Sequence, residues 1–311
     1  MNPVITLYRT YQTNNVMKKI MLYLTAAGFM FASCQKDEEM TTTSSPGAKT
    51  SSTLNVSPVP SNFTQKVLIE KLTGQSELAA PGSERFFTGY CSNTTTSRIF
   101  VASLYNSGYL TVPQTNRLIQ SAGSGTPSLP MAMINRTASM GSPFIRPYAM
   151  TNPINSIMQA TANCGLAMTS ITSGRTASVN IHTGFNANLN SIYRVNVYLI
   201  EDRVINMASQ FSQANGYNTV VGSPYYNLGN PILNYMHMNV VRGVLSGENG
   251  DLIQSSNTVP GGTQVFTYRA DLPVKSNNAS KFYVLAFITD QVTKEVLNVQ
   301  MGELGTTKDW N

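Results

Sequence analysis

The stretch FTQKVLIEKLTGQSELAAP, residues 63–81, decides the fold of the first half of the chain. Val67–Leu72 is rich in large apolar residues and predicts a strand. Thr73–Gln75 contains a glycine and predicts a short loop. Pro81 favours the first turn of a helix, where a missing backbone N–H costs nothing. The stretch therefore predicts a strand, a tight loop and a helix that begins near Pro81.

This strand–loop–helix resembles the active-site segment of thioredoxin-like domains, in which a Trp and a Cys-x-x-Cys pair open the helix. Here Ser76 occupies the position of the Trp, Glu77 and Ala80 occupy the positions of the two cysteines, and Pro81 follows. Thiol exchange requires a thiolate, which a carboxylate cannot replace. The resemblance therefore implies a thioredoxin-like domain that has lost its redox chemistry.

Segments further along predict the rest of an α/β domain over residues 63–164. Their expected order is a buried parallel strand, a short helix, a strand and a second helix: Arg98–Tyr105, Gln114–Ala122, Met131–Arg136 and Asn152 to about Asn163. By the resemblance, Pro130 matches the proline that is cis in thioredoxin folds and lies beside the active loop. It would either leave nearby backbone free to bind an extended peptide or serve only the fold.

The second half, residues 165–311, changes character. It predicts strands with alternating polar and apolar residues separated by turns rich in Gly, Asn and Pro. We expect them at Ala177–His182, Tyr193–Ile200, Asn239–Leu245, Thr263–Arg269, Phe282–Thr289 and Val296–Met301. This pattern predicts an all-β domain, an antiparallel β-sandwich of immunoglobulin-like or jelly-roll-like type. Met207–Leu233 is long for a connection, and long ordered loops are more often functional than connecting.

The N-terminal segment, residues 1–33, predicts an export signal whose true start is Met17, because two lysines and a short apolar run follow it. Phe31–Cys34 resembles a lipobox, so we expect Cys34 to carry lipid and to become the mature N-terminus. Gln35–Glu39 resembles the acidic sorting signal of surface-exposed lipoproteins in some Gram-negative bacteria. Residues 34–62 as a whole are expected to form a flexible tether.

Charge argues against nucleic acid as a partner. The whole chain carries a formal charge of +6, and removal of residues 1–33 leaves 18 basic and 15 acidic residues, a net charge of +3. This excess is small, and no basic stripe with interleaved aromatic residues appears. We therefore expect a membrane contact through the lipid and no nucleic-acid binding.

Few residues are candidates for chemistry. Cys91 and Cys164 could form a disulfide or remain two buried thiols. His182 and His237 lie in or beside expected strands, without the spacing of a zinc site, and no nucleophile, phosphate-binding loop or cofactor motif appears. Among aromatic residues, a contact role is open for Tyr225, Tyr226 and Trp310, although core packing is the simpler interpretation for Trp310.

In their order along the chain, five segments resemble the outer-membrane-protein-28-related lipoproteins of Gram-negative bacteria: VLIEKLTGQ from Val67, LPMAMINR from Leu129, YLIED from Tyr198, HMNVVR from His237 and VLAFITDQVTKEVL from Val284. The resemblance implies a thioredoxin-like domain coupled to a β-sandwich. We expect a lipid-anchored protein of the outer membrane, exposed on the cell surface, that is not an enzyme and needs no cofactor or metal. It would bind an extracellular protein or glycan.

Two other functions remain open at this point. The chain could be an accessory subunit of an outer-membrane uptake or secretion complex, or a thiol oxidoreductase that uses Cys91 and Cys164. The sequence also leaves the oligomeric state open, including a homo-oligomer.

Overall fold

The computed structural model describes residues 55–84, 98–121, 129–137, 150–206, 208–274, 277 and 280–311. The expected signal peptide, Cys34, most of the tether and Cys91 lie outside these residues. Residues 52–311 belong to one compact unit.

The described part of the chain is mostly β-structure with few helices. Its strands are β1 (Val67–Thr73), β2 (Ile99–Tyr105), β3 (Met131–Ile134), β4 (Cys164–Ser173), β5 (Thr176–Phe185), β6 (Tyr193–Asp202), β7 (Val240–Val244), β8 (Asp251–Ile253), β9 (Thr263–Asp271), β10 (Lys281–Asp290), β11 (Val296–Glu303) and β12 (Thr307–Lys308). The helices are α2 (Pro113–Ser121) and α3 (Thr151–Gln159), with 3₁₀ turns η2 (Ser209–Phe211) and η3 (Ser255–Asn257). Residues 80–84 are also helical.

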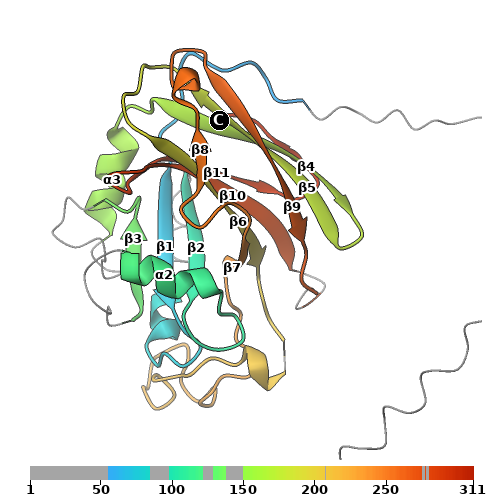
Figure 1. Ribbon diagram of the computed structural model, residues 1–311. Coiled ribbons are helices and arrows are strands. Elements are labelled where there is room, and N and C mark those ends of the chain that lie inside the picture. The colour runs from blue at the N-terminus through green and yellow to red at the C-terminus, as the bar shows by residue number, and fades with distance from the viewer. Residues whose placement is uncertain are drawn as a thin grey trace, which may run out of the picture. The chain divides into compact units, whose positions relative to one another are not determined.

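The strands form two sheets in a sandwich-like arrangement (Figure 1). The larger sheet has the order β11-β10-β6-β7-β2-β1-β3, with β8 paired to β6, and the smaller has the order β12-β4-β5-β9. β1 and β2 are parallel, whereas β3 is antiparallel to β1. Strands from both expected domains therefore share the larger sheet.

The two ends of the larger sheet meet. The amide of Val296 in β11 donates to the carbonyl of Asn135 after β3 over 2.7 Å, and the amide of Lys66 donates to Asn298 Oδ1 over 3.1 Å. The sheet curls around a core that draws on all of its long strands. Its buried members include Leu68, Leu72, Phe100, Leu104, Met133, Ile200, Val241, Leu285 and Phe287.

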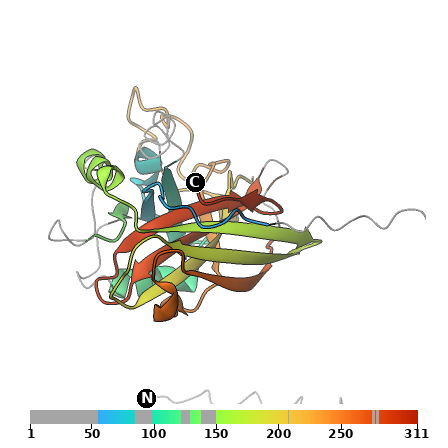
Figure 2. The ribbon, with the colours of Figure 1, turned by 90° about the horizontal axis from the view of Figure 1, so that it is seen from above.

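The other face of β6 and β10 packs on the smaller sheet. Because successive side chains of a strand point to opposite faces, Val195 and Val197 enter this second core while Tyr198 and Ile200 enter the first. Figure 2 shows the yellow-green β4 and β5 running side by side along the red C-terminal strands. A third core lies on the outer side of β1, β2 and β3, where Met150 and Ile154 of the α3 region cover it.

The last residues of the expected tether are packed rather than free, which corrects its boundary at residue 62. Trp310 Nε1 donates to the carbonyl of Ser57 over 2.8 Å, and Val56 and Val59 pack against the small cluster that contains Phe63 and Trp310. The physical reason is apolar burial, because Val56 and Val59 remove apolar surface of the cluster that contains Trp310 from water.

Candidate functional site

The connection between β6 and β7 forms a cap beyond the carboxyl ends of β1 and β2 (Figure 1, lower end). We call residues 204–239 the cap. It is far longer than ordinary connections between strands, and the only regular element among its described residues is the 3₁₀ turn η2. Residues 204–241 contain no Asp, Glu, Lys or Arg. This absence of charge, visible in the printed sequence, is the signal that sequence reasoning missed.

The cap is fastened to the loop that resembles the thioredoxin active site. Gln213 is fully buried, and its Nε2 lies 3.0–3.2 Å from the carbonyl oxygens of Gly74, Gln75 and Glu77. The amides of Ala214 and Gly216 donate to the carbonyls of Gln75 and Leu78 over 2.8 and 3.0 Å. These bonds cover the backbone carbonyls of this loop.

A reciprocal contact comes from the loop itself. Gln75 Nε2 lies 2.9 Å from the carbonyls of Gln210 and Ser212 in the cap, and its Oε1 accepts from the amide of Leu110 over 3.0 Å. Gln75 is buried, so these bonds are shielded from water and are costly to leave unmade.

Beneath the cap lies a group of buried polar side chains. Lys71 of β1 forms a buried ion pair with Glu84 of the helical turn. Tyr105 Oη lies 2.8 Å from His237 Nδ1, and His237 Nε2 lies 2.8 Å from the carbonyl of Phe211. The second contact requires the ring to donate from Nε2, so Tyr105 donates to Nδ1.

Burial sets the charge state of this group. It is the largest cause that lowers the pKa of His237, which is about 4 in all; the bond to Phe211 acts in the opposite direction, and the charge of Lys71 adds to the lowering. Burial, followed by the charge of Glu84, raises the pKa of Tyr105 well above its ordinary value. His237 is therefore neutral and Tyr105 protonated at pH 7. The pair holds the base of the cap and does not exchange protons there.

The outer part of the cap has its own hydrogen bonds. Asn215 Nδ2 donates to the carbonyls of Tyr225 and Gly229 over 2.9 Å, and its amide donates to Asn230 Oδ1 over 2.9 Å. Asn218 Oδ1 accepts from the amide of Gly229 over 2.8 Å. These asparagines substitute for regular secondary structure and give the loop a defined shape.

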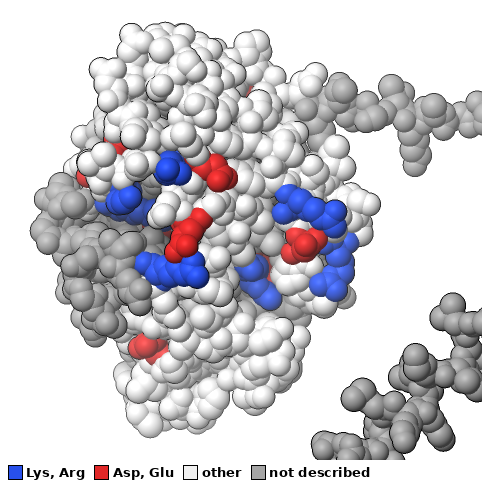
Figure 3. Space-filling view, in the orientation of Figure 1, with Lys and Arg blue, Asp and Glu red and all other residues white. Residues whose placement is uncertain are grey.

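Apolar side chains of the cap face solvent. Val221 is 82% exposed, and the group also includes Val220, Tyr226, Leu228, Leu233 and Met236, with Leu78 and Tyr109 at its margin. In Figure 3 the lower end of the molecule is predominantly white. Uncharged, apolar and rigid surface of this kind is typical of the centre of a protein interface.

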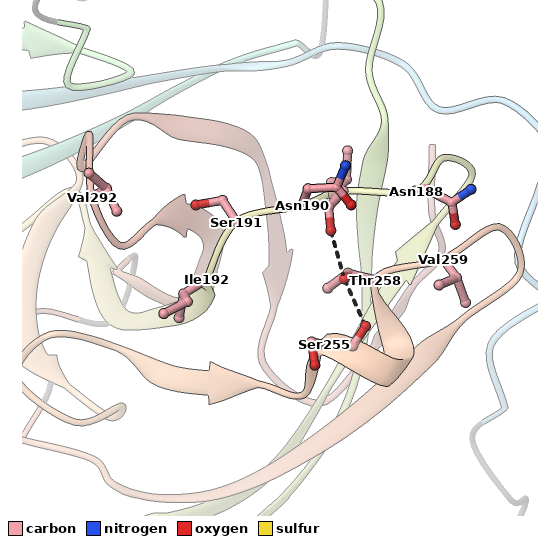
Figure 4. Close-up of a pocket in the computed structure, with 9 residues that line it drawn as sticks. Asn188, Asn190, Ser191, Ile192, Ser255, Thr258, Val259 and Val292 are labelled. Atoms are coloured by element: carbon pink, nitrogen blue, oxygen red, sulfur yellow. Dashed lines mark hydrogen bonds between the residues drawn. The ribbon is translucent and has the colours of Figure 1, made fainter.

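A shallow groove lies elsewhere, where the β5–β6 connection, η3 and the β10–β11 turn meet (Figure 4). Its volume is about 540 Å³, and its lining is uncharged: Asn188, Leu189, Asn190, Ser191, Ile192, Ser255, Thr258, Val259 and Val292. Thr258 Oγ1 lies 3.2 Å from the carbonyl of Leu189 and 3.0 Å from that of Ser255, and so joins two walls. Such a lining suits a neutral polar ligand.

The candidate residues named in the sequence analysis lie at different places in the structure. At the degenerate loop Ser76 is exposed, Glu77 is half-buried, and Ala80 and Pro81 are buried. Ser76 Oγ lies 2.9 Å from Ser107 Oγ. The loop contains no cysteine.

Pro130 is also buried, and the Leu129–Pro130 bond is cis, as the resemblance led us to expect. Cys164 carries a free buried thiol whose pKa burial raises to about 12, so it is not a thiolate at neutral pH. The possible disulfide partner Cys91 lies outside the described residues.

The three candidate aromatic residues differ in their surroundings. Trp310 is buried and serves packing. Tyr225 is half-buried between the rings of Tyr217 and Tyr235, while Tyr226 is 46% exposed on the cap. Only Tyr226 presents a large free surface to a partner.

Two negative findings apply to the described residues alone. No helix among them is long and apolar enough to cross a membrane. Within the same residues, no cluster of three or more His, Cys, Asp or Glu side chains could hold a metal ion.

Comparison with known proteins gives a family and a fold. The model of the family described as Outer membrane protein Omp28 matches residues 120–308, more than half of the chain. HBP35 of Porphyromonas gingivalis has a similar structure, with a TM-score of 0.58 and 17% identity over 78% of this chain and 76% of that chain. A domain of the outer membrane lipoprotein Omp28 from Porphyromonas gingivalis has a TM-score of 0.30 and 15% identity over 49% of this chain and 93% of that one, too low to define a common fold. No curated protein matches the chain.

Proposed function

Because the chain belongs to the Omp28 family of outer membrane proteins, we propose that it is a non-catalytic lipoprotein of the cell surface that binds an extracellular protein through the cap. As a member of this family it is an outer-membrane protein. Its lipid anchor at Cys34 and its surface exposure are part of the proposal. The lipobox at residues 31–34 and the acidic run at residues 35–39 support them.

We also propose that β1, β2 and β3 form a redox-inactive thioredoxin-like unit. Three features support this assignment: β1 is parallel to β2, β3 is antiparallel to β1, and Pro130 directly precedes β3. The helical turn at residues 80–84 begins where the active-site helix of such a unit would begin. In this interpretation the cap occupies the face on which a catalytic relative would bind its substrate.

The observation that carries the binding function is the cap itself. Interfaces are depleted in charge at their core and enriched in aromatic residues and Met, and the cap has this composition. A loop already held by Gln213 and Asn215 loses little conformational entropy when it binds, so more of the contact energy remains for affinity. The exposed side chains are mainly aliphatic, which favours a protein surface over a glycan.

The alternatives have weaker support. A glycan would suit the groove of Figure 4 better than the cap, because the groove offers free amides and hydroxyls. An accessory role in an outer-membrane complex would use the same cap against a membrane partner. A thiol oxidoreductase would need a reactive thiolate, and the high pKa of Cys164 argues against that role for this residue.

The test uses the lipidated full-length protein on intact cells. Val221→Asp places a charge at the most exposed apolar residue of the cap. Val274→Asp is the matched control, because Val274 is 71% exposed between β9 and β10 and belongs neither to the cap nor to the groove of Figure 4. We expect cells with wild-type protein or Val274→Asp to retain labelled extracellular-matrix proteins, and Val221→Asp to reduce retention about tenfold or more. Equal retention by all three proteins would contradict a role of the cap in binding.

Localisation is tested separately. Protease added to intact cells should remove the protein, and Cys34→Ala should release it from the membrane fraction. A protein that resists protease on intact cells but is degraded after lysis would refute surface exposure while leaving the cap open as a periplasmic binding surface.

A further inference from the structure

The outer edge of β9 is unpaired among the described residues. β9 is the last strand of the smaller sheet and pairs only with β5, through nine consecutive partners from Thr176↔Asp271 to Gly184↔Thr263 without a register shift. The N–H and C=O groups that point away from β5 therefore form a regular row along the opposite edge. Such a row is a template for another strand.

This edge lacks most of the features by which soluble proteins protect unpaired edges. The strand TQVFTYRAD contains no Pro and no Lys, and it has no bulge. It is long for an edge strand, since protective edges are usually short. Its two charged residues, Arg269 and Asp271, lie at one end and contact each other over 3.4 Å. Among the described residues this edge is therefore available to a further strand.

The side chains of β9 indicate which partner. We propose that β9 is a dimerisation edge, at which two copies of the chain pair β9 with β9 in antiparallel orientation about a twofold axis at Thr267. A twofold axis makes the contact isologous and closed, and an axis at Thr267 lets all nine residues of each strand take part. The smaller sheets of two copies then join into one sheet of eight strands.

This register brings compatible residues together on both faces. On the half-buried face, Phe266 of one copy lies opposite Tyr268 of the other, twice by symmetry, and aromatic cross-strand pairs are favourable. On the exposed face the two Thr267 residues meet at the axis, and Thr–Thr pairs are also favourable. Val265, which is 51% exposed, comes to lie under the aliphatic part of Arg269.

Charge does not oppose the pairing. Arg269 faces Val265 and Asp271 faces Thr263, so no like charges lie opposite each other in this register. On the inner side, Tyr268 Oη already donates to Asp251 Oδ2 over 2.7 Å, and Gln264 Oε1 accepts from the amide of Gln254 over 2.8 Å. These bonds hold β9 to the β8 region.

The first test is a disulfide at the axis, made in the full-length chain in mild detergent. Thr267→Cys places two thiols opposite each other only in the proposed register, so mild oxidation should convert most of the protein to a disulfide-linked dimer. Val265→Cys should not crosslink alone, but Val265→Cys with Arg269→Cys should. Val292→Cys, on an exposed turn, is the control for random collision. Crosslinking of Val292→Cys at the same rate as Thr267→Cys would overturn the proposal.

The second test does not depend on thiols. Val265→Lys places a second cation opposite Arg269 at two symmetric contacts. It should raise the dissociation constant of the dimer, measured by light scattering over a range of concentrations, about tenfold. Addition of Arg269→Glu should restore the dimer, while thermal unfolding of the single variant shows that the fold is intact. A wild-type chain that stays monomeric at about 100 μM would refute the pairing. Amides of β9 that are all protected from hydrogen exchange in the monomer would also refute it, because residues of the same chain would then cover the edge.

Discussion

Arg136→Met should be among the most destabilising single substitutions in the chain. Glu70 of β1 points into the core inside the curled sheet, where its side chain is 1% exposed. Arg136 Nε and Nη2 donate to its two carboxylate oxygens over 2.6 and 2.7 Å, and Tyr198 Oη donates to it over 2.9 Å. The guanidinium also lies 5.0 Å from the ring centroid of Phe287.

The expected magnitude depends on the groups that the substitution leaves without a partner. Met retains most of the aliphatic volume of Arg136, so the main loss is the charge partner of Glu70. An uncompensated buried charge costs about 3–5 kcal/mol. We therefore expect the free energy of unfolding, measured in urea at pH 7, to fall by about that amount. Replacement of all three polar groups, by Glu70→Leu, Arg136→Met and Tyr198→Phe together, should recover most of the loss.

Arg117→Met is the matched control. Arg117 Nη1 lies 2.6 Å from Glu248 Oε2, the same distance as in the buried pair, but the two side chains are 57% and 52% exposed. Solvent screens this pair, so its removal should change the free energy of unfolding by no more than about 0.5 kcal/mol. If Arg136→Met costs less than about 1 kcal/mol, or no more than Arg117→Met, the argument from burial is wrong.

Three further predictions concern buried groups elsewhere. The folded-state pKa of His237 is about 4, below the unfolded value. The contribution of this histidine to the free energy of unfolding should therefore be fully present above pH 6.5 and be lost as the pH decreases toward 4. The imidazole NMR signals of His237 and His182, the only two histidines, follow this titration directly. Cys164, whose pKa is about 12, should react with a thiol reagent at pH 8 only in denaturant, and site-specific mass spectrometry would detect any native reaction. Trp310→Ala should destabilise the protein by about 3–5 kcal/mol and expose residues 55–62 to a nonspecific protease, whereas cleavage there in the wild-type protein would contradict the packing described.

The expected strands at the centre of the larger sheet are confirmed because their own residues carry the signal. β1, β2, β6 and β10 are rich in apolar residues and appear within a few residues of their predicted bounds. β4 was missed because it is buried along most of its length on both faces. Gly165 lies so close to Phe63 that an added Cβ would be 2.2 Å from its ring, and no alternation of polar and apolar residues marks such a strand.

The candidate site was predicted only in part, for the same reason. The length of the segment Met207–Leu233 predicted a functional loop, and the resemblance singled out the loop Thr73–Gln75 with Ser76 and Glu77. Nothing local indicated that Gln213 would bind the backbone of that loop, because the two lie more than 130 residues apart in the chain. The pairing of β2 with β7 at Ser103 and Val240, which joins the two halves in one sheet, was not predicted for the same reason.

The sequence by itself determined the family resemblance, the absence of cysteine at Glu77 and Ala80, most strand positions and the absence of charge from residues 204–241. Only the tertiary structure decided which strands pair, that strands of both halves share one curled sheet, that the cap binds the loop at residues 74–78, and that β9 has a single partner strand among the described residues. The physical reason is that a strand's existence depends on the period of its own side chains, whereas its partner depends on hydrogen bonds and burial contributed by distant segments.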